Sequence, residues 1–464
     1  MDKIKSLTES YSKGRMTRRE FLRKAALLGL SAPAAMAALE AASRPAVAMP
    51  YVKEPVTIKL AHYFDPLQSP AQKFNTAWMY STVGKFEQEN PDIKVEPELF
   101  QWDQIDNRSI LDFQAGISHD LMFGSPQLMP KHFAVGDYLD LTPYLESWSK
   151  EEIEDFSWSP VWGKSGREGK QIGVPTGVHT RTVAYRRDMF EAAGLDPDNP
   201  PATWEDCLEA AKALTTDEVW GLAMYFGPSR ATIELYFAPF IWHFGGVLWD
   251  PEEKKAAFAS EAGVKAAQVL YDLVYTDKVT PEAAVGGSYD DHILVAFLNG
   301  RVAMGWGFGS YWIVALEDGG FIKNCFPATA ECSEETGGVM VTPTIPGAQF
   351  TNAWTLSIHA LSEHPDEAFK LLEFMVRPEN LYDFPDAGLP TRLSLWEKPE
   401  FQSDFYTKWL EAARKGKPMP FTVYYPELAD TCAACIQEIL VQKAPVEETL
   451  KKFEDEWNAK YAGE

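Results

Sequence analysis

The sequence predicts an α/β protein of two domains. Apart from a leader of 48 residues, the chain has 416 residues, and a single hydrophobic core seldom serves more than about 250–300 residues. Val56, Ile58 and Leu60 alternate with polar or small residues, which is the period of a β-strand. A helix is expected over 73–89 and a second strand over 93–100. This order is typical of a mainly parallel sheet with helices on its faces.

Helices with clear start signals follow further along the chain. Thr203 offers its hydroxyl as a cap and Asp206 the returning contact, before a stripe of hydrophobic residues begins at Trp204. Pro365 is placed to begin a helix over 364–376, with acidic residues in its first turn. No long linker separates the two expected domains, so short crossings should join them.

The first 48 residues have the three parts of a removable export signal. A basic segment precedes an apolar run of roughly 15 residues, and Ala46-Val47-Ala48 supplies a small-residue cleavage site. The order Thr17-Arg18-Arg19-Glu20-Phe21-Leu22-Arg23-Lys24 resembles the twin-arginine (Tat) signal family, whose route exports folded proteins. We expect cleavage after Ala48. The alternative is a basic amphipathic helix or a short membrane anchor, although the run falls short of the roughly 20 residues that span a bilayer.

The net charge of the remaining chain excludes some classes of partner. Residues 49–464 carry 34 basic and 63 acidic residues, a formal charge of −29. Nucleic acids and anionic membranes are bound through excess Lys and Arg, so neither is expected as a partner. We expect a soluble monomer. Met49 follows the cleavage site where a lipoprotein would have Cys.

Five cysteines follow the leader, and an oxidising compartment would allow some of them to pair. Cys325 and Cys332 are a plausible local disulfide. Cys432-Ala-Ala-Cys435 is compatible with a redox or zinc motif, but no second pair of ligands has suitable spacing, so structural cysteines on a helix are favoured. Cys207 is expected in a helix core. No metal or cofactor is expected.

Several segments together resemble the extracellular solute-binding proteins of ABC importers, in the sugar-binding family of maltose-binding protein. The matching segments are GVPTGVHTR at 173–181, FLNGRVAM at 297–304 and TNAWTLSI at 351–358. Asn352-Ala353 departs from the glycines usual in the last segment. The matches keep the family's order over most of residues 54–395.

The resemblance implies a type II periplasmic binding protein, in which two α/β lobes close on a ligand. It places lobe 1 at 54–178 plus 350–388 and lobe 2 at 179–349 plus 389–464, with crossings near 176–181, 347–352 and 388–392. The implied function is a periplasmic receptor that captures a sugar and delivers it to a membrane permease. The Tat export machinery would be a further partner.

Candidate ligand contacts are of two kinds, because sugars have apolar faces that stack on aromatic rings and hydroxyls that need planar polar groups. Residues after the expected strands lie where ligands bind in such folds: Tyr63, Asp65, Gln101, Trp102, Ser125 and Gln127. His179 and Arg181 lie in the first crossing. Trp306 and Tyr311 belong to a glycine-rich segment in which the backbone can approach a ligand. Trp354 and Arg392 complete the set. Each alternatively serves packing or the hinge.

Two other functions compete with a sugar receptor. A secreted carbohydrate-active enzyme would need two carboxylates placed across a scissile bond, but the acidic pairs at 290–291 and 334–335 are adjacent in sequence. A receptor for a polyol or another non-sugar solute keeps the same fold. An anionic solute would need a cationic cluster, which His179, Arg181 and Arg392 would supply.

Overall fold

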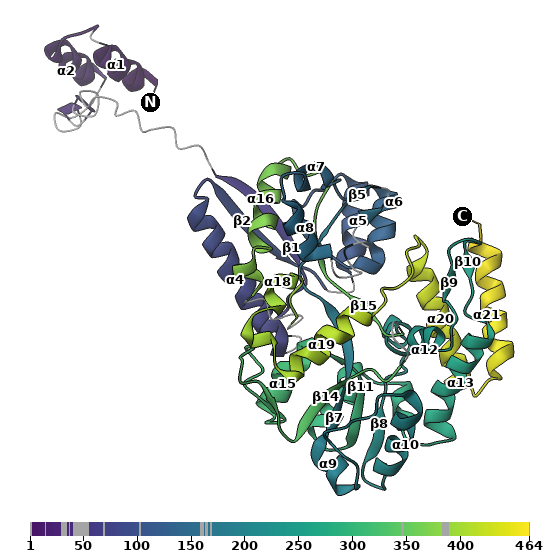
Figure 1. The fold of residues 1–464 in the computed structure, drawn as a ribbon. Helices are drawn as coiled ribbons and strands as arrows, with labels where there is room; N and C mark the ends of the chain where they lie inside the picture. The colour runs from purple at the N-terminus through teal and green to yellow at the C-terminus, as the bar shows by residue number, and fades with distance from the viewer. Residues whose placement is uncertain are drawn as a thin grey trace. The chain divides into compact units, whose positions relative to one another are not determined.

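The computed structural model describes residues 2–13, 15–28, 35–36, 38–39, 55–67, 70–101, 104–157, 162, 166–167, 169–344, 348–382 and 389–463. The chain divides into two compact units, Met1–Pro55 and Val56–Glu464 (Figure 1). The expected cleavage triplet at 46–48 and the candidate residue Trp102 lie outside the described residues.

The described residues of the first unit include the helices α1 (Asp2–Ser12) and α2 (Arg18–Leu27). Thr17 caps α2 through its side chain, and Glu20 returns the contact to the Thr17 backbone, which completes a capping box. Phe21 is fully buried and meets Tyr11 edge-on, with ring centroids 5.3 Å apart. Among the described residues, no helix is long and apolar enough to cross a membrane.

The second unit is built on two five-stranded sheets (Figure 1). The first sheet has the order β2 (Ile93–Leu99), β1 (Val56–His62), β3 (Leu121–Gly124), β16 (Thr355–Ile358) and β6 (Val174–Pro175). β1 pairs in parallel with β2 and β3, whereas β16 runs antiparallel to β3 and β6. The expected strand–helix–strand order is therefore confirmed, and the sheet is mixed because β16 returns from a distant part of the chain.

The second sheet has β7 (His179–Arg186) near its centre. Its order is β14 (Gly337–Val341), β7, β11 (Val302–Gly309) and β8 (Trp220–Ala223), and β15 (Thr351–Asn352) also pairs with β7. β11 is antiparallel to β7 and parallel to β8. A bulge interrupts β11 between Trp306 and Phe308, and Gly307 at the bulge has a φ of +89°, a conformation that L side chains rarely adopt.

Helices cover both sheets. With the first sheet lie α4 (Pro70–Glu89), α5 (Ile105–Ala115), η1 (Pro126–Leu128), α6 (Met129–Val135), α7 (Thr142–Leu145), α8 (Lys150–Ser157), α16 (Pro365–Met375) and α17 (Pro378–Leu381). The central part of the chain adds α9 (Arg187–Ala192), α10 (Trp204–Leu214), α11 (Arg230–Thr232), η3 (Ile233–Phe237), α12 (Ala238–His243), α13 (Glu261–Tyr275), η4 (Glu282–Val285), η5 (Asp291–Val295), α14 (Ala296–Leu298), η6 (Ser310–Trp312) and α15 (Ile313–Asp318). The C-terminal part adds α18 (Leu393–Trp396), η7 (Pro399–Phe401), α19 (Asp404–Lys415), α20 (Tyr425–Val441) and α21 (Val446–Tyr461).

Three short hairpins complete the secondary structure of the described residues: β4 (Gly166–Arg167) with β5 (Lys170–Gln171), β9 (Trp249–Asp250) with β10 (Lys255–Ala256), and β12 (Ile322–Lys323) with β13 (Ser333–Glu334). Cys325 and Cys332 form a disulfide in the last of these, which confirms the expected pair. Cys207, Cys432 and Cys435 are buried and free. Among the described residues, no group of three or more His, Cys, Asp or Glu is arranged to hold a metal ion.

Each sheet has its own hydrophobic core, and the chain passes between the cores on short segments. Three residues separate β6 of the first sheet from β7 of the second, and β15 leads back to β16. After the described residues resume at Leu389, Leu395 packs in the first core and Trp396 in the second. This arrangement agrees with the two lobes that the resemblance implies, and the lobe boundaries given above stay a prediction.

Candidate ligand-binding site

The ends of several strands bring candidate residues together at one edge of the first sheet. β1 ends at His62 and β3 at Gly124, and these strands are parallel, so the residues after them lie at the same edge. β16 is antiparallel and begins at Thr355, which pairs with Gly124. Trp354 therefore reaches the same edge as Tyr63. Their rings stack, with centroids 3.8 Å apart and planes inclined by 26°.

This aromatic pair is supported from one side and partly open on the other. Tyr63 is 3% exposed and meets Phe123 edge-on at 5.9 Å, whereas Trp354 is half-buried. An indole ring held from behind and partly exposed in front offers a flat surface to an apolar ligand face. The stacking role of both residues stays a prediction.

Ser125 is held by a buried chain of charged groups. Its backbone N–H donates to Asp106 Oδ1 at 2.9 Å and its hydroxyl to Asp106 Oδ2 at 2.8 Å. Asp106 Oδ1 lies 3.1 Å from His132 Nε2, and His132 Nδ1 lies 2.8 Å from Asp137 Oδ2. Burial acts to lower the pKa of His132, but the hydrogen bonds and charges of Asp106 and Asp137 outweigh it and raise the pKa to about 9. The Ser125 hydroxyl keeps its acceptor lone pairs for a ligand.

Gln127 connects the two sheets through polar side chains. It lies on η1, next to the first sheet, and its amide N–H donates to Glu234 Oε1 on η3 at 3.4 Å. Asn352 of β15 donates to Gln127 Oε1 at 2.5 Å, and the Tyr425 hydroxyl donates to Glu234 Oε1 at 2.7 Å. We call Gln127, Asn352, Glu234 and Tyr425 the interlobe cluster. Planar amides and a carboxylate of this kind are suited to bind paired hydroxyl groups.

Glu234 is the acidic member of the interlobe cluster. Burial raises the pKa of its carboxyl, and the charges of Arg230 and Arg181 with the bonds from Tyr425 and Gln127 offset only part of this effect. The residue lies in a π-helical turn, a rare geometry that often occurs at functional sites.

The second sheet places Arg181 and Tyr311 close together. Arg181 pairs with Gly309 at the end of β11, and Tyr311 follows on η6. The guanidinium lies 5.6 Å from the centre of the Tyr311 ring and 6.0 Å from that of Phe350. His179, at the start of β7, is 8% exposed and pairs with Asn352 of β15. These residues lie near the interlobe cluster along the chain crossings.

Four other candidates lie in different surroundings. Trp306 is 1% exposed and packs against Phe240 and Trp204, each with ring centroids at 5.6 Å. Arg392 donates from Nε to Val376 O and from Nη1 to Asp155 Oδ2, at 2.8 and 3.1 Å.

Asp65 accepts from the Leu67 N–H at 2.9 Å, and Gln101 is exposed. Trp306 thus serves core packing and Arg392 an ion pair, and each of these roles is an alternative to ligand contact. Their proposed roles stay predictions.

The sequence analysis did not identify Glu234, Tyr425 or Arg230. Glu234 is the only charged residue in the apolar stretch Ile233–Phe237, and a lone acid in such a stretch is a signal that sequence reasoning can use. Tyr425 gives no comparable signal, because its hydrogen-bond partner Glu234 lies 191 residues away in the sequence.

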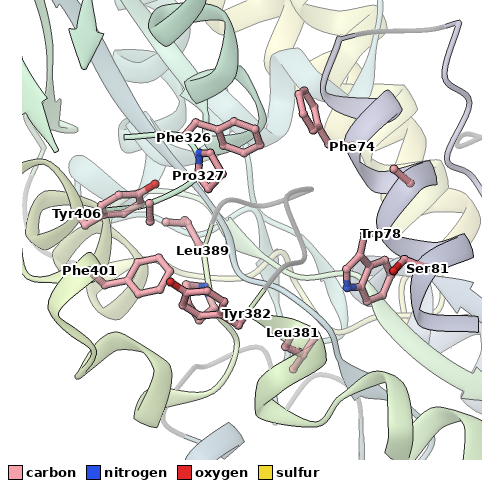
Figure 2. Close-up of a pocket in the computed structure, with 13 residues that line it drawn as sticks. Phe74, Trp78, Ser81, Phe326, Pro327, Leu381, Tyr382, Leu389, Phe401 and Tyr406 are labelled. Carbon is pink, nitrogen blue, oxygen red and sulfur yellow. The ribbon is translucent and has the colours of Figure 1, made fainter. Parts of the chain in front are cut away.

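A separate cavity of about 340 Å³ lies between α4 and the loop closed by the Cys325–Cys332 disulfide, which we call the disulfide loop (Figure 2). It shares no lining residue with the interlobe cluster. Its walls are nearly all apolar: Phe74, Ala77, Trp78, Ser81, Phe326, Pro327, Ala328, Leu381, Tyr382, Leu389, Pro390, Phe401 and Tyr406. Mostly apolar walls offer few hydrogen-bond partners to hydroxyl groups, so the interlobe cluster is the better candidate for binding a polar solute.

Comparison with known families agrees with this geometry. The sequence profile of a family described as bacterial extracellular solute-binding protein matches residues 68–381, more than half of the chain. The protein belongs to this family. It is therefore a solute-binding receptor and not an enzyme, and the expected α/β binding-protein fold is confirmed.

Individual relatives of this solute-binding protein are distant but cover most of it. A putative binding protein of Brucella abortus (strain 2308) is 25% identical over 379 residues, which are 79% of this chain and 85% of the relative. The arabinooligosaccharide-binding protein of Halalkalibacterium halodurans is 23% identical over 409 residues, 80% of this chain and 84% of the relative. An ABC transporter solute-binding protein of Thermotoga lettingae, solved with α-D-tagatose, matches with a TM-score of 0.72 at 25% identity. That match covers 88% of this chain and 99% of the other.

Proposed function

We propose that this solute-binding protein captures a carbohydrate between its two lobes and delivers it to the permease of an ABC transporter. The observation that carries the proposal is the interlobe cluster, in which Gln127 beside the first sheet bonds to Glu234 beside the second at 3.4 Å. A ligand that replaces or bridges this bond contacts both lobes, so it favours the closed arrangement over the open one. Relatives that bind tagatose and arabinooligosaccharide support a carbohydrate.

The proposed site combines a stacking surface with polar groups from both lobes. Trp354 and Tyr63 offer the flat surface, while Gln127, Asn352, Glu234 and Arg181 offer donors and acceptors. Ser125 beside the first sheet and His179 and Tyr311 beside the second complete the proposed set. Asp65, Gln101, Trp102, Trp306 and Arg392 remain candidates from the sequence.

The proposal is tested by a thermal-shift screen of sugars, polyols and organic acids. A solute that binds only the folded protein raises the melting temperature, by an amount that grows with its concentration relative to Kd. We expect sugars to give the largest shifts. If polyols or organic acids raised the melting temperature and no sugar did, the carbohydrate assignment would be wrong.

A matched pair of tryptophan variants tests the stacking surface. Trp354→Ala should weaken sugar binding by about 1–3 kcal/mol, because it removes the stacked ring. Trp220, 37% exposed at the start of β8 and outside the proposed site, provides the control, and Trp220→Ala should leave the affinity unchanged. Equal affinities for the two variants would remove Trp354 from the site.

We also propose that the protein is exported through the Tat route to the periplasm and released by cleavage near Ala48. This part rests on the twin-arginine segment at 17–24. In the described part of the leader, Arg18 and Arg19 are exposed in the first turn of α2, where a partner can reach them.

A further inference from the structure

We propose that the captured solute is a sugar acid, whose carboxylate binds to Arg181 and Ser310 at the edge of the second sheet. This inference rests on the proposed function and specifies its ligand class. It is carried by two buried donors, one on β7 and one on η6 directly after β11, that have no acceptor among the described residues.

Arg181 forms no ion pair with a carboxylate among the described residues, unlike most arginines that lie near acidic groups there. Five arginines form ion pairs with a carboxylate within 4.0 Å: Arg108, Arg186, Arg187, Arg377 and Arg392. Arg181 forms none. Its Nη1 donates to the backbone oxygen of Thr180 at 3.1 Å, and its Nε is buried without an acceptor among the described residues. A buried donor without a partner costs about 1–3 kcal/mol, and more when it is charged, so an acceptor supplied by a ligand would be strongly favoured.

Ser310 supplies the second donor. It is 2% exposed, and its hydroxyl has no hydrogen-bond partner among the described residues. It follows Gly309, the residue that pairs with Arg181 across β11 and β7. Tyr311, the next residue, has its ring 5.6 Å from the Arg181 guanidinium. The two unpartnered donors therefore belong to one small region beside an aromatic ring.

Several acids lie around this region, and none of them forms an ion pair with Arg181 among the described residues. Glu234 is the acid whose charge reaches both Arg181 and Arg230, and it also accepts from Tyr425 and Gln127. Arg230 also interacts with the charges of Asp106 and Asp430, while the charge of Asp290 reaches Tyr289 and Tyr311, which lie beside Arg181. A carboxylate ligand would give the Arg181 guanidinium the ion pair that it lacks among the described residues.

The planar shape of the Arg181 guanidinium indicates which anionic group of a ligand it binds. Its planar fork presents parallel N–H groups that match the two oxygens of a carboxylate, and the Ser310 hydroxyl adds a third donor. A phosphate monoester carries nearly two negative charges at neutral pH, which is more than one guanidinium neutralises. The hydroxyls of the same ligand are left to the interlobe cluster, so a uronic or aldonic acid fits better than a neutral sugar.

Matched ligand pairs test the inference on the purified protein by calorimetric titration. D-Glucuronate is compared with D-glucose and D-galacturonate with D-galactose, since each pair differs only in a carboxylate at C6. D-Glucose 6-phosphate is the third arm. We expect each acid to bind about tenfold or more tightly than its neutral partner, the gain typical of a hydrogen bond to a charged group. The preference should shrink as salt is added.

Variants assign the preference to the two donors. Arg181→Gln should abolish it, Arg181→Lys should keep part of it because the charge remains, and Ser310→Ala should reduce it less. Arg377→Gln is the control: it removes the same charge at an exposed ion pair with Glu89, and it should keep the full preference. Circular dichroism checks folding. If Arg181→Gln does not fold, Arg181→Lys and Ser310→Ala still decide the question.

The outcomes separate this inference from the proposed function. Neutral sugars that bind as tightly as their acids, or an Arg181→Gln variant with an unchanged preference, would overturn the sugar-acid assignment and leave a sugar receptor. Tighter binding of glucose 6-phosphate than of glucuronate would replace the carboxylate by a phosphate. Binding of a non-sugar acid such as citrate, with no binding of any sugar or sugar acid, would overturn the carbohydrate proposal itself.

Discussion

Glu234 is a carboxyl group whose environment opposes its ionisation, and this has consequences for stability. Burial raises its pKa above the ordinary value of 4.5. When the folded pKa is raised, the protonated form stabilises the fold. That contribution is present below pH 4.5 and is lost as pH rises through the raised pKa. Ionisation of this carboxyl therefore comes at a cost to the fold, as is common in binding sites.

We predict that Glu234→Gln raises the free energy of unfolding at pH 7 while it weakens ligand binding. Glutamine keeps the size of the side chain and resembles the protonated acid, so the gain should disappear near pH 4.5. Urea unfolding at the two pH values measures it, with the exposed Glu89→Gln as a control. A variant that is less stable than the wild type at pH 7 would show that attraction to Arg230 outweighs burial.

His132 titrates with the opposite effect on stability. Asp106 and Asp137 hold its pKa at about 9, above its ordinary value of 6.5. The charged ring thus stabilises the fold fully below pH 6.5, and the contribution is lost as pH rises through about 9. We predict that His132→Asn costs about 3–5 kcal/mol at pH 7, since it leaves two buried acids without their cation.

Urea unfolding from pH 6 to pH 9.5 checks this prediction. The wild type should lose stability across this window more steeply than His132→Asn. His364, which is half-buried at the start of α16, provides the control, and His364→Asn should keep the wild-type slope. Equal slopes for the wild type and His132→Asn would mean that His132 is not charged in the folded protein.

At the scale of single elements, hydrogen bonds hold the disulfide loop between β12 and β13 in addition to the Cys325–Cys332 bridge. Glu317 accepts from the N–H groups of Asn324 and Cys325 at 2.7 and 2.8 Å, and Tyr406 donates to Cys325 O at 2.5 Å. These bonds position the loop in the folded state. The bridge should therefore act mainly by restricting the unfolded chain.

We predict that the double change Cys325→Ser and Cys332→Ser lowers the free energy of unfolding by about 2–3 kcal/mol, as expected for a bridge that closes a short loop. Ligand affinity should be unaffected, because the loop shares no residue with the proposed site. Reductant should destabilise the wild type and leave the double variant unchanged. A large loss of affinity in the double variant would place the loop in the binding mechanism.

Elements with local signals were predictable from the sequence, and those that depend on distant partners were not. The alternation at 56–60 predicts β1, and the cap at Thr203 predicts α10, because both signals lie within the element. β16 gives no sign that it joins β3 and β6 in antiparallel orientation, since both partners lie far away in the sequence. Residues of α4 show the same limit: a helix was expected over 73–89, but no local signal shows that Phe74 and Ser81 line a cavity.

The same limit applies to the candidate site. Strand ends identified Tyr63, Ser125 and Gln127 as residues of one sheet edge, because parallel strands end together. The sequence does not show that Arg392 meets Asp155 across 237 residues, or that Trp306 packs on Phe240. It also does not reveal the Gln127–Glu234 bond, since that contact depends on how two separately formed lobes meet.

The whole molecule combines the first unit, Met1–Pro55, with a receptor whose sheets are made from interleaved segments of the chain. β15 and β16 return from the second sheet to the first, so neither lobe is complete until most of the chain has been made. Export of an already folded protein through the Tat route is compatible with this topology. The receptor would then reach the oxidising compartment folded, with Cys332 partly exposed and Cys325 buried, and the bridge would close there.

We predict that replacing Arg18 and Arg19 with lysines stops export and leaves folded receptor in the cytoplasm. The change keeps the charge and the capping box of α2, so it removes only the arginine pair that resembles the Tat signal. Cell fractionation locates the protein, and a thermal shift with a bound sugar shows whether each fraction is folded. Thiol labelling should find Cys332 reduced in the retained protein and protected in the exported wild type. Normal export of the lysine variant would mean that the chain uses another route, and retained protein that is unfolded would mean that the receptor does not fold before export.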